Sequence, residues 1–141
     1  MERNSGILLH LTSLPDNSIC GSFGNPSRKW LNDLAASGIG TWQFLPLAPP
    51  DSLGSPYSSP SSFALNPWFL DANDLVRDGF LSCNIEEIAI NIENSNNRVD
   101  FQLADLKVKY LTLSLVENWS KQNTNTKTEF QIWCDKQFWL D

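Results

Sequence analysis

The start of the chain contains two apolar runs with a helical pattern between them. Residues 6–11 and 41–46 are short apolar or β-branched runs, which are typical of buried strands. Asn25 followed by Pro26 is typical of a helix start, and Gly38 is a typical helix end. The apolar residues of this helix share one face: Trp30, Leu31, Leu34 and Ala35. A strand, a helix and a strand within about forty residues predict a βαβ unit with parallel strands.

Residues 47–67 predict a long loop, because they are rich in proline, serine and glycine. A loop of this length within a compact domain is usually functional or disordered. It carries Tyr57 and Phe63 and is followed by Trp68, whereas disordered linkers contain few aromatic residues. We therefore predict an ordered functional loop, followed by a short strand at residues 68–70.

Beyond residue 70 the pattern is mainly helical. Asn73 to Arg77 predicts a short helix closed by Gly79, and the Asn- and Glu-rich residues 82–98 predict a surface segment. Asp100 can cap a long helix whose apolar residues form two stripes, so this helix needs cover on two sides. The stripes are Leu103, Leu106, Tyr110, Leu113 and Val116, and Val108, Leu111, Leu115 and Trp119.

A last helix is predicted near the end of the chain. Thr126 and Glu129 have the spacing of a capping box at its start. Its apolar residues are Phe130, Trp133, Cys134 and Phe138.

Composition restricts the class of protein. The 141 residues are 41% hydrophobic and 18% charged, which is typical of a soluble globular domain. The net charge of −6 argues against nucleic acid and anionic membranes as partners, because both attract basic surfaces. The sequence contains neither the apolar core of a signal peptide nor the ~20 apolar residues of a membrane span, so we expect a cytoplasmic protein.

The cysteines predict no metal or redox site. Cys20, Cys83 and Cys134 are far apart and form no C-x-x-C motif, so we expect buried thiols in a reducing compartment. The sequence also has no phosphate-binding loop and no cluster of metal ligands. We therefore predict neither a metal nor an organic cofactor.

Three motifs occur in order along the first half of the chain. They are GILLHLTSLP at residues 6–15, WQFLPL at 42–47 and GSPYSSPSSFALNP at 54–67. Together they resemble the N-terminal signature of glycoside hydrolase family 77, the 4-α-glucanotransferases (amylomaltase or disproportionating enzyme). The resemblance extends from about Ser5 to Leu81 and continues more weakly to the last residues.

The resemblance implies an α/β fold, namely the N-terminal part of a (β/α)₈ TIM-type barrel with a mainly helical inserted subdomain. Residues 1–81 would supply the first barrel strands, a helix and the substrate-binding loop, and residues 82–141 the helical insertion. A complete barrel takes ~250 residues, so the barrel is expected to be incomplete in this chain. We expect a fragment with poor solubility by itself, or a partner that completes the barrel.

Four residues are candidates for substrate binding, three of them through the family resemblance and one through its place beside the loop. Ser55 and Tyr57 match positions that contact glucan, although an ordinary turn with a packed tyrosine would give the same pattern. His10, the single histidine, would lie near the barrel mouth, where either a supporting or a purely structural role is open. Trp68 is the best candidate for an exposed tryptophan. The tryptophans expected in the core are Trp30, Trp119 and Trp133.

No catalytic residue is predicted. Retaining transfer uses two carboxyl groups ~5–5.5 Å apart, and in the family both lie on later barrel strands. Asp51 is the only carboxylate inside the long loop. Asp33, Asp71 and Asp74 have the pattern of caps or solvated surface charges. The sequence departs from the family at Leu11, where proline is frequent, and at Gly54, where an acidic residue is frequent.

The expected function is therefore transfer of α-1,4-glucan segments to an acceptor glucan or glucose, by an enzyme of which this chain is a part. The partner would be an α-1,4-glucan or a maltooligosaccharide. Two alternatives stay open: a non-catalytic glucan-binding module, and one half of a split enzyme that assembles with a separate C-terminal half.

Overall fold

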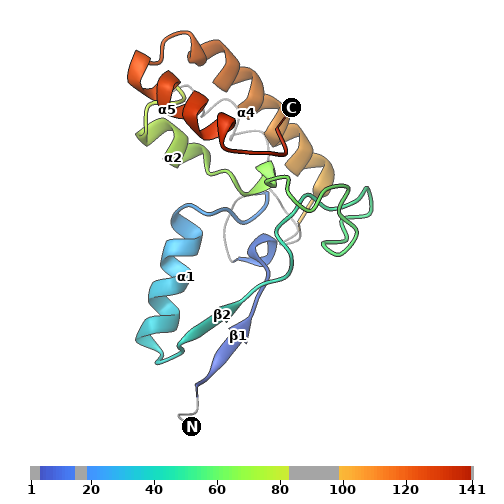
Figure 1. Ribbon diagram of the computed structural model, residues 1–141. Coiled ribbons are helices and arrows are strands. Elements are labelled where there is room, and N and C mark those ends of the chain that lie inside the picture. Colours follow the sequence, from blue (N-terminus) through green and yellow to red (C-terminus); the bar gives the residue numbers. More distant parts are fainter. Residues whose placement is uncertain (1–3, 15–18, 83–98, 141) are drawn as a thin grey trace.

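The first part of the chain forms a parallel strand pair connected by a helix. The computed structural model describes residues 4–14, 19–82 and 99–140. Strand β1 (Gly6–Leu8) pairs in parallel with β2 (Thr41–Gln43), and α1 (Asn25–Ala36) connects the two strands (Figure 1). This confirms the predicted βαβ unit. The strands are shorter than predicted, since a 3₁₀ helix, η1 (Leu11–Ser13), begins soon after β1.

The strand pair is covered on one face only. Ile7 and Trp42 are opposite each other in the register and are half-buried. The next pair, Leu8 and Gln43, points to the opposite face and is exposed, as side chains alternate along a strand. The prediction of fully buried strands is therefore wrong for the described residues. Parallel sheets are normally covered on both faces, whereas one face of this pair stays open within the described residues.

Helix α1 begins one residue earlier than predicted, with Gly24 instead of Asn25 as its N-cap. A Cβ atom on residue 24 would lie 1.9 Å from the Asp71 carboxylate, so only glycine fits there. Pro26 lies in the first turn, where its missing N–H has no cost, and Gly38 follows the helix with a φ of 71°, as predicted.

The predicted strand at residues 68–70 is a turn of 3₁₀ helix, η2 (Pro67–Phe69). The Asn66 side chain accepts a hydrogen bond from the Trp68 backbone N–H at 3.0 Å, and Pro67 fixes a helical φ, so local capping decides against a strand. The short helix α2 (Ala72–Arg77) follows, capped by Asp71 and closed by Gly79, as predicted.

The second half is a pair of antiparallel helices (Figure 1). Asp100 caps α4 (Phe101–Trp119), which confirms that prediction. Helix α5 (Thr124–Asp135) is capped by Asn123, whose side chain accepts from the Thr126 N–H, so the predicted capping box is wrong. Phe138 lies beyond α5.

Aromatic rings join these two helices. The rings of Trp119 and Phe130 meet edge to face with centroids 5.1 Å apart. Of the three tryptophans expected in the core, Trp30 packs partly buried against it and Trp119 is half-buried. Trp133 is 41% exposed, so its assignment to the core was wrong.

The main core lies where the two halves meet. It combines residues after β1, residues of η2 and the first turn of α4: Leu11, Leu14, Ile19, Cys20, Trp68, Phe69 and Ala104. The first predicted stripe of α4 is largely exposed, at Leu106, Tyr110, Leu113 and Val116. The core therefore fixes the loops that follow the strands, whereas the outer faces of the helices stay open.

Two sequence expectations fall partly or wholly on residues 83–98, which are outside the described part. These are the surface segment 82–98 and the burial of Cys83. Cys20 is a buried thiol and Cys134 a half-buried one. Burial raises the pKa of the Cys20 thiol to about 11, so it remains protonated. In the described part of the chain, every helix is too short or too polar to cross a membrane.

Candidate functional site

The carboxyl ends of β1 and β2 lie at one edge, because the strands are parallel. The chain after β1 is fastened to β2 by two hydrogen bonds. The Leu9 N–H donates to the Gln43 carbonyl at 2.9 Å, and the Trp42 indole N–H donates to the Leu9 carbonyl at 2.8 Å. His10 and the long loop therefore start from neighbouring points of the fold.

His10 is half-buried and packs edge to face on Phe69, with ring centroids 5.9 Å apart. Its Nδ1 atom is buried and has no hydrogen-bond partner within the described ranges. Desolvation lowers the pKa of His10, so the imidazole is neutral at neutral pH. The structure thus places His10 at the strand edge as a neutral group, not as a cation.

The long loop is held by its one carboxylate. Asp51 Oδ1 accepts hydrogen bonds from the backbone N–H of Leu53 at 2.9 Å and of Ser55 at 3.0 Å. Gly54 has a φ of 78°, and a Cβ atom there would lie 2.4 Å from the Phe101 ring. The departure from the family pattern at Gly54 thus has a physical reason, because both the backbone conformation and the ring favour glycine.

Serine side chains hold the second half of the loop. Ser59 Oγ donates to the Ser61 carbonyl at 2.7 Å, and Ser61 Oγ accepts from the Ala64 N–H at 3.1 Å. The Phe63 ring packs edge to face on Phe138, with centroids 5.3 Å apart. Residues 47–66 thus form an ordered loop, as predicted for that segment.

Tyr57 is the most exposed aromatic residue of this loop. Its side chain is 73% exposed, and the neighbouring Ser55 is half-buried. A tyrosine offers a flat apolar ring with a polar tip, and a serine hydroxyl can donate and accept, so together they can contact the apolar faces and hydroxyls of a sugar.

Trp68 does not share this exposure. It is 8% exposed, and its indole N–H donates to Asp105 at 2.8 Å. Its ring stacks on Phe101 with centroids 5.3 Å apart. The expectation that Trp68 is the best exposed tryptophan is therefore wrong. Because Phe101 also lies against Gly54, Trp68 instead supports the loop from within the core.

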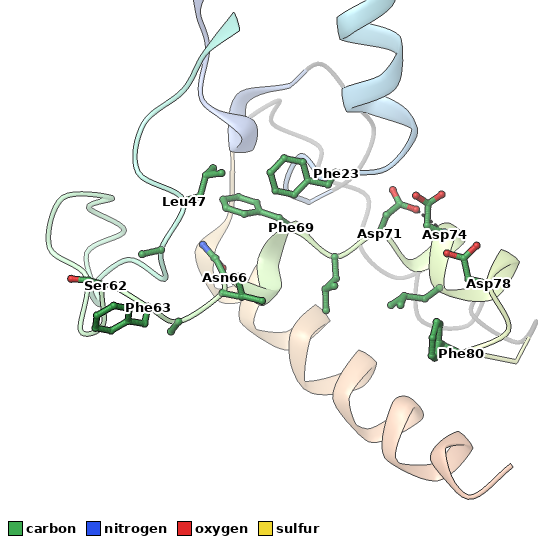
Figure 2. Close-up of a pocket in the computed structure, with 15 residues that line it drawn as sticks. Phe23, Leu47, Ser62, Phe63, Asn66, Phe69, Asp71, Asp74, Asp78 and Phe80 are labelled. Atoms are coloured by element: carbon green, nitrogen blue, oxygen red, sulfur yellow. Dashed lines mark hydrogen bonds between the residues drawn. The ribbon is translucent and has the colours of Figure 1, made fainter. Parts of the chain in front are cut away.

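A pocket of about 520 Å³ lies between the loop and α2 (Figure 2). Its walls are mostly apolar and include Phe23, Leu47, Phe63, Leu65, Phe69 and Phe80. The four predicted substrate-binding residues do not line this pocket; they are His10, Ser55, Tyr57 and Trp68. Sequence reasoning missed this pocket because its wall residues come from separate segments with no shared spacing; the only signal was the group of aromatic residues around the loop.

The nearby carboxylates are engaged in the fold. Asp74 accepts from both terminal nitrogens of Arg28 at 2.8 Å and from Arg77 at 2.6 Å. The hydrogen bond from Arg28 lowers the pKa of Asp74, which is the opposite of what a general acid requires. Within the described ranges no group of three potential metal ligands occurs.

The crossover unit, with an ordered loop at its carboxyl edge, is the organisation of an α/β protein whose site is built on the loops after parallel strands. The family model described as 4-alpha-glucanotransferase, glycoside hydrolase family 77, matches residues 9–141. The chain belongs to this family.

Two relatives match this chain over nearly its whole length. The 4-alpha-glucanotransferase of Synechocystis sp. is 34% identical over 99% of this chain and 28% of the relative, and that of Streptococcus pneumoniae is 32% identical over 99% and 27%. Among solved structures, an amylomaltase from Streptococcus agalactiae in complex with acarbose has 28% identity and a TM-score of 0.79. That match covers 94% of this chain and 28% of the amylomaltase chain, so this chain spans little more than a quarter of its relatives' length.

Proposed function

We propose that this chain is the N-terminal part of the (β/α)₈ barrel of a 4-α-glucanotransferase. In this proposal, residues 1–81 supply the first strands and the substrate loop, and residues 82–141 supply a mainly helical insertion. The enzyme moves segments of a 1,4-α-glucan to a new 4-position on an acceptor glucan or glucose, with retention. The two carboxyl groups that retention requires come from the part of the enzyme that this chain does not match.

The observation that carries the proposal is the exposed Tyr57 on a loop fixed by Asp51, in a chain that matches this family. A fixed loop holds the ring in place before the sugar arrives, which reduces the entropy lost on binding. The matched amylomaltase is in complex with acarbose, which supports a maltooligosaccharide as the ligand.

The open face of the strand pair supports a barrel that is completed by further chain. Leu8 and Gln43 are exposed on that face, and each strand has one unpaired edge within the described sheet. Further parallel strands would pair with these edges and cover the face. A separately produced C-terminal half could supply them as well as a continuous chain could.

Reconstitution tests the function. This chain is co-produced with the part of the Synechocystis relative that it does not match, and the purified pair is supplied with maltotriose. We expect glucose and longer maltooligosaccharides to form, with retention at the transferred carbon. The Tyr57→Ala variant should lower kcat/KM about fivefold or more, since one lost stacking contact is worth ~1 kcal/mol or more. Tyr110→Ala, at the other tyrosine, is the matched control. An assembled pair without transfer activity would reject the proposal.

A non-catalytic glucan-binding module is the second candidate, favoured by the fact that Tyr57 is already exposed and its loop already ordered in this chain. Titration of the isolated chain with maltoheptaose by calorimetry tests it. Saturable binding that is lost in Tyr57→Ala supports the module, and the absence of heat rejects it.

A further inference from the structure

The pocket beside the loop is built from several separate segments. Phe23 comes from the connection between β1 and α1, Leu65 from the long loop, and Phe80 from the chain after α2 (Figure 2). Phe69 lies between them, and its carbonyl accepts a hydrogen bond from the Phe23 N–H at 3.0 Å. The pocket is thus built entirely from the first part of the chain, between residues 23 and 80.

The three carboxylates at its rim are already hydrogen-bonded. Asp71 accepts from Ser22 Oγ at 2.6 Å and from the Asp74 N–H at 3.0 Å. Asp74 is held by two arginines, and Asp78 accepts from Arg77 Nε at 2.9 Å. Sugar recognition needs several polar groups aimed at hydroxyls, whereas these carboxylates serve the fold. The chemistry of the pocket therefore favours an apolar occupant over a glucan.

Apolar side chains around the opening are exposed to water. Leu65 is 72% exposed, and Phe23, Phe63 and Leu70 are exposed as well. An apolar hollow with an exposed apolar margin is the usual form of a surface that another polypeptide covers.

The matched amylomaltase indicates which polypeptide this is. Its structure superposes on 94% of this chain with a TM-score of 0.79, yet only 28% of that chain takes part. The fold that carries the pocket is therefore found in a molecule that contains much more chain, whereas the apolar residues around the opening are exposed in this chain.

We propose that the pocket is the docking site for an apolar segment from the remaining part of the 4-α-glucanotransferase, separate from the glucan contact at Tyr57. This inference rests on the proposed function. It divides the loop into two roles: Tyr57 faces the sugar, and Leu65 anchors the rest of the enzyme.

Leu65→Glu tests the docking site, because it places a charge in the opening without touching a hydrogen bond of the fold. The matched control is Leu53→Glu, at a residue of the same loop that is 85% exposed and does not line the pocket. Each tagged variant is co-produced with the unmatched part of the Synechocystis relative, and the ratio of the two polypeptides after affinity purification is measured. Circular dichroism of each variant alone checks that the fold is unchanged.

We expect the recovered partner to fall at least tenfold for Leu65→Glu and to stay within twofold for Leu53→Glu and Tyr57→Ala. Equal recovery with the two glutamate variants would overturn the docking site, as would no recovery with the unmodified chain. Maltoheptaose binding lost in Leu65→Glu would make the pocket a sugar site, and a homodimer disrupted by Leu65→Glu would make it a self-association site; either overturns the proposal. Assembly without transfer activity would instead reject the proposed function and leave the docking site standing.

Discussion

The loop of residues 47–66 and the η2 turn that follows it differ in the exposure of one aromatic side chain each. Tyr57 in the loop is 73% exposed and makes no ring contact within the described residues. Trp68 in η2 is 8% exposed, stacked on Phe101 and hydrogen-bonded to Asp105. The loop exposes the Tyr57 side chain to solvent, and η2 anchors the loop through the buried Trp68.

This difference shows that order and exposure are separate properties of a loop. The loop is ordered because Asp51 fixes its first half and Phe101 lies against Gly54. Since Trp68 holds Phe101, rigidity in the loop derives from burial in η2. Tyr57 can stay exposed because other residues stabilise the segment that carries it.

The largest expected effect on stability is at Trp68, the buried anchor in η2. Trp68→Ala should lower the free energy of unfolding by about 3–5 kcal/mol, because it leaves a cavity in the main core. Urea denaturation of the isolated chain measures this. Trp133→Ala, at a tryptophan that is 41% exposed, is the control and should cost much less. Equal costs would mean that η2 is not the anchor.

The connection between anchor and loop is tested next. Gly54→Ala forces a left-handed conformation on alanine and a contact with Phe101, so we expect a loss of about 2–3 kcal/mol. Gly38→Ala is a matched control, because Gly38 has a φ of 71° and open space around its Cβ position. It should lose only about 1 kcal/mol. If both substitutions have the same cost, Phe101 does not restrain the loop.

A smaller, pH-dependent effect is expected at His10, which packs on Phe69 of the anchor. Burial lowers the pKa of folded His10 below 6.5, so the unfolded chain binds the proton first as the pH falls. The stability from neutral His10 is complete above pH 6.5 and decreases below it. The midpoint temperature of thermal unfolding should decrease as the pH is lowered from 7.5 to 5.5. The decrease should be smaller in His10→Gln. A midpoint that is unchanged over this range in the unmodified chain would contradict the expectation.

Sequence patterns were most informative where a local rule decides the structure. The cap of α4 at Asp100, the end of α1 at Gly38 and the parallel pairing of the two strands were all predicted. Family motifs also led to the family that the comparisons show. These features depend on neighbouring residues or on a short crossover.

Two local caps were missed, Asn66 before η2 and Asn123 before α5. The other errors came from contacts between distant residues. Trp68 is buried by Phe101 and Asp105, which lie more than thirty positions later in the chain. Gly24 lies at the N-cap position that the pattern assigned to Asn25, and a Cβ atom there would meet the Asp71 carboxylate, which is far along the chain. The pocket combines residues from 23 to 80, and no periodicity links them. Such features follow from packing, which a local pattern does not contain.

The smallest expected effect on stability is at Tyr57, and it separates the two interpretations of the Ser-Pro-Tyr motif. If the ring is presented to solvent, Tyr57→Ala should change the free energy of unfolding by less than about 0.5 kcal/mol. An ordinary turn with a packed tyrosine would instead lose ~2 kcal/mol or more. Urea denaturation of Tyr57→Ala beside the unmodified chain distinguishes these outcomes. A residue that contacts the ligand and does not stabilise the fold should show two results together. Its substitution should leave the free energy of unfolding nearly unchanged, and it should strongly lower the transfer activity of the reconstituted pair.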